Sequence, residues 1–283
     1  MAYIGCHGKG GDDFNKIFDA IRAVNGNMMQ IFVGNPLQGM KDTVYKKYMG
    51  KLGDDIKQYL EDNNVKLVIH SPYIINISNN KKDYFGIDHL IKELEISDNI
   101  GSIGCVLHVG KYVVAENEEE GLENMYNNIK IILKARGKGT SKLIIETPAG
   151  QGSELLTDIK DFANFYNRFT NSEKKNLGIC VDTAHIWATG VDLSTAIKVR
   201  EYFDEFKKLF GKKALTLIHL NNSKVKVGDC KDRHAPIFGI GGKIPVISLK
   251  EVVIIGKELK VPLILETPGD KDPEIEWMYK IVN

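Results

Sequence analysis

The sequence predicts an α/β fold, a single (β/α)8 TIM barrel, on three observations. The chain has 283 residues, close to the roughly 250 residues that one such barrel takes. Short apolar segments of strand length alternate with amphipathic segments of helix length from end to end. This alternation predicts a parallel sheet, and about eight strand–helix pairs predict its closure into a barrel. No linker or change of composition divides the pairs, so we expect residues 1–283 to form one domain.

The expected strands are short apolar runs that end at polar or turn-forming residues. They are Tyr3–Cys6, Met28–Val33, Lys66–Ile69, Gly104–His108, Lys142–Glu146, Leu177–Asp182, Leu215–Leu220 and Pro262–Glu266. An open, doubly wound sheet is the competing architecture, but its first strand usually leads into a GxGxxG phosphate turn. The segment Gly8-Lys9-Gly10-Gly11 lacks that spacing. The barrel is therefore the favoured fold.

The expected helices lie between the strands and show apolar residues at helical spacing. They are Asp12–Val24, Thr43–Asn63, Ile87–Ser97, Glu118–Lys134, Asp158–Phe169, Leu193–Phe210, Ser248–Leu259 and Pro273–Ile281. The second helix has the clearest pattern, because its apolar residues fall on one stripe. That stripe is Tyr45, Tyr48, Met49, Leu52, Ile56, Tyr59 and Leu60.

The composition excludes several classes of protein. With 43% hydrophobic and 27% charged residues, the chain has enough apolar material for a core and is not disordered. No segment reaches the ~20 apolar residues that span a bilayer, and residues 1–5 do not resemble a signal peptide. The net charge of +1 excludes a strongly basic coat for nucleic acid. Four cysteines without a CxxC motif are typical of a reduced protein, so we expect an intracellular chain without membrane contact.

Histidines and carboxylates stand at the ends of the expected strands. His70, His108 and His219 end, or nearly end, three strands, and apolar residues precede two of them on the same face. Glu146, Asp182 and Glu266 occupy the equivalent place on three others. In a parallel barrel all carboxyl ends of the strands open onto one face, where the active sites of this fold lie. Six side chains of the types that bind metals should therefore converge there.

Two nearby motifs extend this cluster. Asp182-Thr183-Ala184-His185 places a second histidine just beyond its strand, and Asp232-Arg233-His234 lies in the long loop after the seventh strand. Each residue alone is more often a satisfied polar or salt-bridged group. Together, several unpaired carboxylates in one buried mouth need divalent cations to balance them.

Nine residues are thus candidate metal ligands, without any thiolate among them. They are His70, His108, Glu146, Asp182, His185, His219, Asp232, His234 and Glu266. This set suits Zn²⁺, with Mn²⁺ or Fe²⁺ as alternatives. At roughly three protein ligands per catalytic metal, it is enough for two or three ions. Sites with several ions suit phosphodiester hydrolysis, in which both the attacking and the leaving oxygen develop charge.

The order of these motifs along the chain resembles that of the endonuclease IV family of abasic-site DNA repair enzymes. The matching motifs run from the first strand to the last. Their combination is specific to the family, although no single motif is. The segments are Val68-Ile69-His70-Ser71-Pro72-Tyr73-Ile74-Ile75-Asn76, Leu107-His108-Val109-Gly110, Ile145-Glu146-Thr147-Pro148-Ala149-Gly150-Gln151-Gly152, Cys180-Val181-Asp182-Thr183-Ala184-His185, Ile218-His219-Leu220-Asn221-Asn222-Ser223-Lys224, Asp232-Arg233-His234 and Leu265-Glu266-Thr267.

The resemblance implies a xylose-isomerase-like barrel that holds three zinc ions. The first ion would be bound by His70, His108 and Glu146, the second by Glu146, Asp182, His219 and Glu266, and the third by His185, Asp232 and His234. Glu146 and Glu266 would be catalytic as well. The implied reaction is hydrolysis of the phosphodiester 5′ to an abasic site, which leaves a 3′-hydroxyl and a 5′-deoxyribose phosphate. Removal of 3′ blocking groups is also implied. The implied partner is double-stranded DNA, bound by a monomer.

The resemblance also suggests which residues contact DNA. Tyr73 and Ile74 match wedge residues of the family, whereas Leu37 stands where the family often has an arginine. We expect these three side chains to fill the gap in a kinked duplex. Residues 221–243 carry a net charge of +3, and within them we expect Lys224 and Arg233 to meet phosphates.

The motifs do not fix the roles of three further residues. His7 is followed by Gly8-Lys9-Gly10-Gly11 rather than the family's small residues, so it either supports the ligands or is structural. Cys230, beside Asp232, is expected to be a bystander, although it could compete for metal. His89, in the middle of an expected helix, is interpreted as structural.

Two other functions remain open on the sequence. Related barrels that isomerise or epimerise sugars also place His, Asp and Glu around divalent cations. They need one or two ions, so the triplet His185, Asp232 and His234 is the feature that favours the nuclease. The second alternative is a non-catalytic barrel that binds DNA or stores metal. The sequence disfavours it, because every expected ligand position still has a residue able to bind metal.

Overall fold

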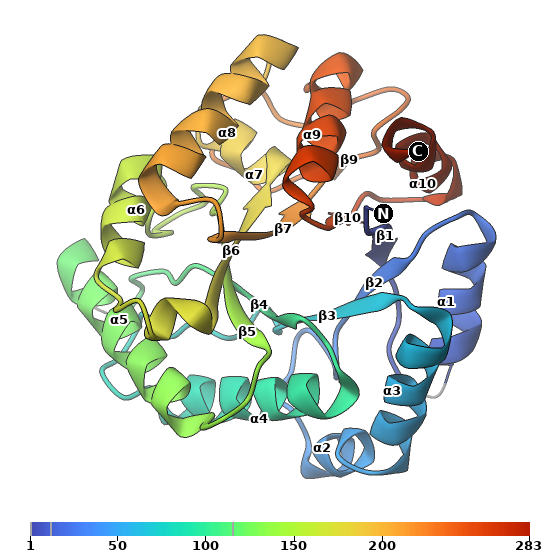
Figure 1. Cartoon of the computed structure of the whole chain (residues 1–283). Coiled ribbons are helices and arrows are strands. Elements are labelled where there is room, and N and C mark those ends of the chain that lie inside the picture. The colour runs from blue at the N-terminus through green and yellow to red at the C-terminus, as the bar shows by residue number, and fades with distance from the viewer. Residues whose placement is uncertain (1, 12, 115) are drawn as a thin grey trace.

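The barrel predicted from the sequence is confirmed in the computed structural model, which describes residues 2–11, 13–114 and 116–283. Eight parallel strands close in the order β1-β10-β7-β6-β5-β4-β3-β2, with helices around them (Figure 1). The strands are β1 Ile4–His7, β2 Met28–Ile31, β3 Lys66–His70, β4 Gly104–His108, β5 Lys142–Glu146, β6 Leu177–Asp182, β7 Leu215–His219 and β10 Leu263–Leu265. Each ends within one residue of its expected carboxyl end, except β2, which ends earlier because the apolar run in the sequence continues beyond the strand.

The helices form the outer layer of the barrel. They are α1 Phe14–Ala23, α2 Asp42–Tyr48, α3 Lys51–Asn63, α4 Tyr84–Ile100, α5 Glu118–Ala135, α6 Ile159–Asn167, α7 Thr183–Ala188, α8 Ala196–Phe210, α9 Val246–Leu259 and α10 Asp272–Val282, with a 3₁₀ turn, η1, over Glu173–Lys175. The expected start of the first helix, Asp12, lies outside the described residues.

One expected helix, Thr43–Asn63, is wrong, because the chain forms α2 and α3 there instead. Gly50 has a non-helical backbone (φ −117°, ψ −146°) and separates the two. A side chain at Gly53 would place its Cβ 1.9 Å from the carbonyl oxygen of Tyr48, so the turn between the helices is too tight for any residue but glycine. Met49, assigned to the buried stripe, is exposed at this turn.

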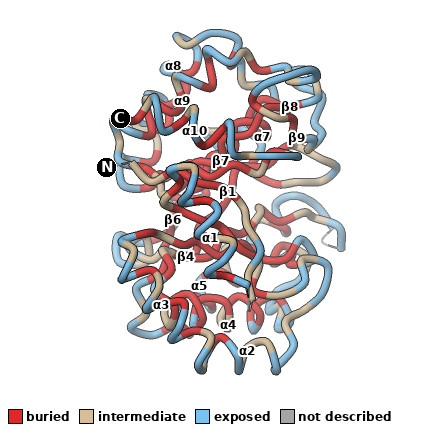
Figure 2. Tube along the Cα trace, turned by 90° about the vertical axis from the view of Figure 1, so that its right-hand side faces the viewer, coloured by how far each residue is buried: buried red, intermediate tan, exposed pale blue. Residues whose placement is uncertain are grey.

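Two small elements at the carboxyl ends of the strands did not show in the sequence pattern. The helix α7 begins directly after β6, and a two-stranded antiparallel sheet joins β8 Asn222–Ser223 to β9 His234–Ala235. Figure 2 shows α7, β8 and β9 on the opposite side of the molecule from the two termini. These elements are too short for a periodic signal, yet they carry or adjoin three of the candidate ligands. Among the described residues, no helix is long and apolar enough to cross a membrane.

The core of the barrel explains where the polar side chains converge. Seven inward-facing residues, one on each of seven strands, form a buried layer inside the sheet. They are Met28, Val68, Val106, Ile144, Cys180, Leu217 and Ile264. Successive side chains of a strand point to opposite faces, so the residue two positions further on points inward again.

Candidate metal centre

A polar layer lies directly above this apolar layer, at the carboxyl ends of the strands. Its seven members follow the seven core residues at a spacing of two, and His7 at the end of β1 completes it. They are Gln30, His70, His108, Glu146, Asp182, His219 and Glu266. One register therefore brings six of the nine candidate ligands into the mouth of the barrel. Most of them are fully or nearly fully buried.

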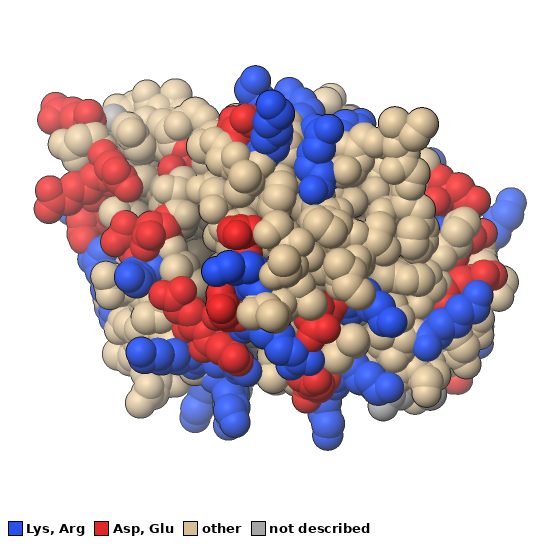
Figure 3. All heavy atoms as spheres, turned by 90° about the horizontal axis from the view of Figure 1, so that it is seen from above, with Lys and Arg blue, Asp and Glu red and all other residues tan. Residues whose placement is uncertain are grey.

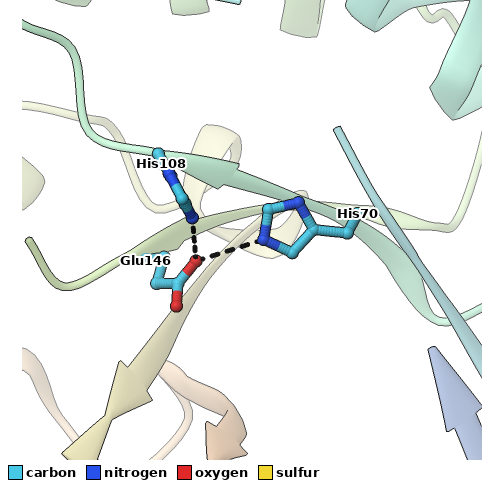
Figure 4. A group of neighbouring side chains, drawn as sticks. All are labelled: His70, His108 and Glu146. Carbon is cyan, nitrogen blue, oxygen red and sulfur yellow. Dashed lines mark hydrogen bonds and ion pairs between the residues drawn. The ribbon is translucent and has the colours of Figure 1, made fainter. Parts of the chain in front are cut away.

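The first group contains His70, His108 and Glu146, which point toward one another from β3, β4 and β5 (Figure 4). The Nε2 atoms of His70 and His108 lie 3.4 and 3.1 Å from Oε2 of Glu146. The Nδ1 of His70 lies 2.7 Å from the carbonyl oxygen of Ser71. Because a carbonyl only accepts, Nδ1 carries the proton and Nε2 keeps a free lone pair. The histidine is thus oriented as a metal ligand usually is.

The second group contains Glu146, Asp182, His219 and Glu266. Nδ1 of His219 lies 2.8 Å from Oε1 of Glu146, 3.3 Å from Oε2 of Glu266 and 3.9 Å from Oδ2 of Asp182. Each oxygen of Glu146 therefore faces a different group of imidazoles. A carboxylate in this position is able to bridge two ions, which is the role that the resemblance implies for it.

The third group lies over the edge of the barrel and contains Asp182, His185 and His234. Asp232 joins it, because its Oδ1 lies 3.4 Å from Nε2 of His185 and 3.2 Å from Nε2 of His234. Oδ2 of Asp182 lies 3.6 Å from Nε2 of His234. The short elements α7 and β9 bring this group together: Asp182 caps α7 through Oδ1, which accepts from the backbone nitrogens of Ala184 and His185 at 2.7 and 2.9 Å.

Two buried nitrogen atoms of the third group indicate that a cation fits there. Nδ1 of His185 donates to the carbonyl oxygen of Thr147 at 2.9 Å, which leaves Nε2 as the free lone pair. Nε2 of His185 and Nε2 of His234 are buried and form no hydrogen bond within the described part of the chain. A buried polar atom without a hydrogen bond lowers the stability of the folded protein. Because imidazole nitrogens and carboxylate oxygens surround the same space, the donor set suits a divalent transition metal.

The charges of these groups are strongly coupled. Burial alone would raise the pKa of Glu146, but the imidazoles of His219 and His108 outweigh it and hold that pKa well below its usual range. Burial alone would lower the pKa of His234, yet the carboxylates of Asp182 and Asp232 raise it to about 9. The carboxylates and imidazoles of this cluster therefore stabilise each other's charged forms. A bound metal would compete with protons for the imidazole nitrogens.

Sequence reasoning missed two amides that support the ligands. Nε2 of Gln30 donates to Oε1 of Glu266 at 2.6 Å, and Oε1 of Gln30 accepts from Nε2 of His219 at 2.8 Å. Nδ2 of Asn221 donates to Oδ2 of Asp182 at 2.6 Å. A lone glutamine in an otherwise apolar strand is a signal that could have found Gln30, since a buried amide needs partners.

Three further side chains have their places clarified by the structure. His7 is beside the site, with Nδ1 at 3.6 Å from Oε1 of Glu266 and 3.0 Å from Nε2 of Gln30. Cys230 belongs to no group of ligand-type side chains among the described residues, whereas the buried Cys180 lies within reach of Glu146 and His219. A thiol that could compete for metal is therefore Cys180, which the sequence analysis did not consider.

The residues expected to contact DNA lie around the mouth. Leu37, Tyr73 and Ile74 are exposed, at 68%, 57% and 42%, and the ring of Tyr73 lies 6.1 Å from that of His70. Lys224 and Arg233 are also exposed and pair by a backbone hydrogen bond, in which the nitrogen of Lys224 donates to the carbonyl oxygen of Arg233 at 2.8 Å. In Figure 3, Lys and Arg side chains lie together at the upper edge of the view, and others lie along its lower edge among Asp and Glu. All five side chains are exposed, and their contact with DNA stays a prediction.

Comparisons with known proteins agree with this architecture. The sequence profile of the xylose isomerase-like TIM barrel family matches residues 18–281. The probable endonuclease 4 of Petrotoga mobilis is 31% identical over 100% of this chain and 96% of its own length. The putative endonuclease 4 of Acanthamoeba polyphaga mimivirus is 33% identical over 86% of this chain and 78% of its own length.

Solved structures share the fold at lower identity. Endonuclease IV from Thermus thermophilus superposes with a TM-score of 0.73 at 21% identity, covering 99% of this chain and 97% of its own. A D-tagatose 3-epimerase-like protein superposes with a TM-score of 0.72 at 17% identity, covering 100% and 98%. Two different activities thus occur on one barrel architecture, so the overall shape does not choose between them.

The fold and the site define a xylose isomerase-like TIM barrel with a mouth of histidines and carboxylates able to hold metal ions. Within that class, the two relatives described above, at 31% and 33% identity, are named as a probable and a putative endonuclease 4. The chain belongs to the endonuclease IV family.

Proposed function

We propose that this chain is a zinc-dependent apurinic/apyrimidinic endodeoxyribonuclease of base-excision repair. It hydrolyses the phosphodiester 5′ to an abasic site in double-stranded DNA and leaves a 3′-hydroxyl and a 5′-deoxyribose phosphate. The same proposal includes removal of blocking groups from 3′ ends. It also includes that the protein acts inside the cell and as a monomer. Membership of the endonuclease IV family supports the nuclease reaction.

One observation carries the proposal: two carboxylates connect all three groups of ligands. Glu146 faces His70 and His108 with one oxygen and His219 with the other. Asp182 lies within 3.9 Å of His219 and 3.6 Å of His234. The three groups are therefore adjacent positions of one cluster. One or two ions, which are enough for a sugar isomerase or epimerase, would leave the third group without a metal to bind.

When bound, divalent ions in such a cluster lower the pKa of a coordinated water from 15.7 to about 7 and stabilise charge on the phosphoryl and leaving oxygens. One ion would be held by His70, His108 and Glu146. A second would be held by Glu146, Asp182, His219 and Glu266, and a third by His185, Asp232 and His234. This assignment rests on the family and on the donor groups described above.

The chain's own residues supply orientation. Gln30 fixes the proton of His219 on Nε2, which directs Nδ1 toward the carboxylates. Asn221 donates to Asp182 and accepts, through Oδ1, from the backbone nitrogen of Glu266 at 2.8 Å. Hydrogen bonds of this kind hold ligands in the orientation and tautomer that a metal requires. A general acid is not required for this reaction, because bound ions can stabilise the charge on the leaving oxygen.

Recognition of the abasic site is assigned to the rim. The exposed side chains of Leu37, Tyr73 and Ile74 would fill the gap where a base is missing. Lys224 and Arg233 would contact phosphates, which positions the duplex without reading its sequence.

The test is incubation of the purified protein with a labelled duplex that carries a tetrahydrofuran abasic analogue, with and without a chelator. We expect one cut 5′ to the lesion, a product with a 3′-hydroxyl that a polymerase extends, and loss of cutting in chelator. Metal analysis should find close to three zinc ions per chain. A value near one, together with an intact duplex, would contradict the proposal and favour a sugar isomerase or epimerase.

A further inference from the structure

Two aromatic side chains are exposed at the beginning of α4, outside the metal centre. Tyr84 and Phe85 are 73% and 56% exposed, although they occupy the first turn of a long helix that is otherwise well packed. Asp83 caps that helix by accepting from the backbone nitrogen of Gly86 at 3.3 Å. The cap fixes the first turn, and each ring is more than half exposed there. Adjacent exposed aromatic residues are typical of a binding surface.

This aromatic pair continues the rim already described. A Cβ atom at Gly39 would lie 3.0 Å from the Phe85 ring, so the loop that contains Leu37 lies directly against Phe85. Within the same loop, the carbonyl oxygen of Pro36 accepts from the backbone nitrogen of Tyr73 at 3.0 Å. The exposed side chains of Tyr73, Leu37 and Phe85 therefore stand on segments that contact one another.

A buried network holds the loop and the helix together. Nδ1 of His89 accepts from the backbone nitrogen of Met40 at 3.3 Å, and its Nε2 lies 3.4 Å from Oε1 of Glu93. Cys105 donates its thiol proton to Oε2 of Glu93 at 3.3 Å. The side chains of His89, Glu93 and Cys105 are all buried. Because the network ties the end of the loop to α4, Leu37 and Phe85 are presented as parts of one rigid surface.

Positive charge lies beside the aromatic pair. Lys81 and Lys82 precede it in the chain and line a groove of about 600 Å³, together with Lys130 and Lys134 of α5. The acidic side chain of the groove is Glu173, which pairs with Lys130 at 3.8 Å. Aromatic faces next to ammonium groups are the combination by which proteins bind single-stranded nucleic acid: bases stack on the rings and phosphates pair with the lysines.

We propose that Tyr84 and Phe85, with Lys81 and Lys82, bind an unpaired segment of DNA that adjoins the duplex in the active site. We infer DNA rather than another nucleic acid from the proposed function. We infer a single strand rather than a duplex from the exposed rings and the basic groove. A duplex would hide its base faces from the rings, so an unpaired strand fits the surface better. The enzyme would thereby favour lesions next to a gap or an unpaired end.

The test compares two lesion-free probes by fluorescence anisotropy: a short blunt duplex, and the same duplex extended by unpaired thymidines. We expect the zinc-loaded protein to bind the extended probe about fivefold or more tightly than the blunt one. Tyr84→Ala and Lys81→Gln should each bring this ratio toward one. Tyr279→Ala and Lys212→Gln, which change an exposed tyrosine of α10 and an exposed lysine between α8 and β7, are the matched controls and should leave the ratio unchanged.

Three outcomes would overturn the proposal. They are equal affinity of the wild-type protein for both probes, a ratio that survives Tyr84→Ala and Lys81→Gln, and tighter binding of the same extension made of ribonucleotides. Each variant is first compared with wild type for zinc content and unfolding temperature, so that misfolding is recognised. The probes contain no abasic site, and the readout therefore stays valid whether or not the protein cuts the tetrahydrofuran duplex.

Discussion

The side-chain amide of Gln30 donates to Oε1 of Glu266 across the mouth of the barrel, at a distance of 2.6 Å. The other end of the same amide accepts from His219 at 2.8 Å. Gln30 is fully buried, so both contacts are shielded from water. One residue of β2 therefore fixes two proposed ligands that lie far away in the sequence.

Replacement of Gln30 should weaken metal binding more than it weakens the fold. In Gln30→Ala, His219 loses the acceptor that fixes its proton and Glu266 loses a donor. We expect the affinity for zinc to fall about 10- to 100-fold, measured by competition with a chelating dye. Asn167→Ala, an exposed amide on α6, is the matched control. Unchanged zinc affinity in Gln30→Ala would contradict a supporting role.

Glu266→Gln should keep the fold and lose cleavage. The amide has the same shape as the carboxylate but no negative charge, and it cannot balance the second ion. We expect cutting of the tetrahydrofuran duplex to fall by about 100-fold or more. The control is Glu276→Gln, an exposed glutamate on α10. Wild-type activity in Glu266→Gln would show that this carboxylate is not needed for the reaction.

The strand ends were predictable because each strand of the barrel is an apolar run with a polar residue at its end. That pattern assigned six of the polar residues in the mouth, from His70 to Glu266, to their correct places. The break at Gly50 was not predictable from periodicity, because the apolar stripe continues through it. The contacts of Gln30 span 189 and 236 residues. No local spacing can reveal partners at such separations.

Metal removal should destabilise the protein as well as inactivate it. The ions bind the folded state alone, and at a free concentration of about 100 times the dissociation constant each ion contributes about 2.7 kcal/mol. For a chain of this size the loss of each ion lowers the unfolding temperature by about 5 °C, measured by calorimetry with and without chelator. Zinc added back should restore both the temperature and the cleavage. Equal unfolding temperatures in both states would contradict ion binding at this buried site.

Tyr73→Ala should weaken DNA binding with metal content unchanged. The ring is 57% exposed and lies 5.6 Å from the ring of His108, so it is positioned to stack at the gap without being a ligand. We expect about tenfold weaker binding of the abasic duplex, measured by anisotropy with the metal-loaded protein. Tyr279→Ala should leave affinity unchanged. Loss of zinc from Tyr73→Ala would instead identify a structural tyrosine that supports the first group.

Glu274 connects two loops that carry proposed ligands, and its removal should affect both. From α10 it accepts from the backbone nitrogen of Ile237, three residues after His234, and from the hydroxyl of Thr267, next to Glu266. In Glu274→Ala these buried donors lose their partner, which costs about 1–3 kcal/mol each. We expect a lower unfolding temperature and weaker zinc retention, whereas Glu276→Ala, two residues away and exposed, should change neither. If Glu274→Ala loses stability but retains zinc with wild-type affinity, the two loops hold their ligands without this carboxylate, and its role is confined to the fold.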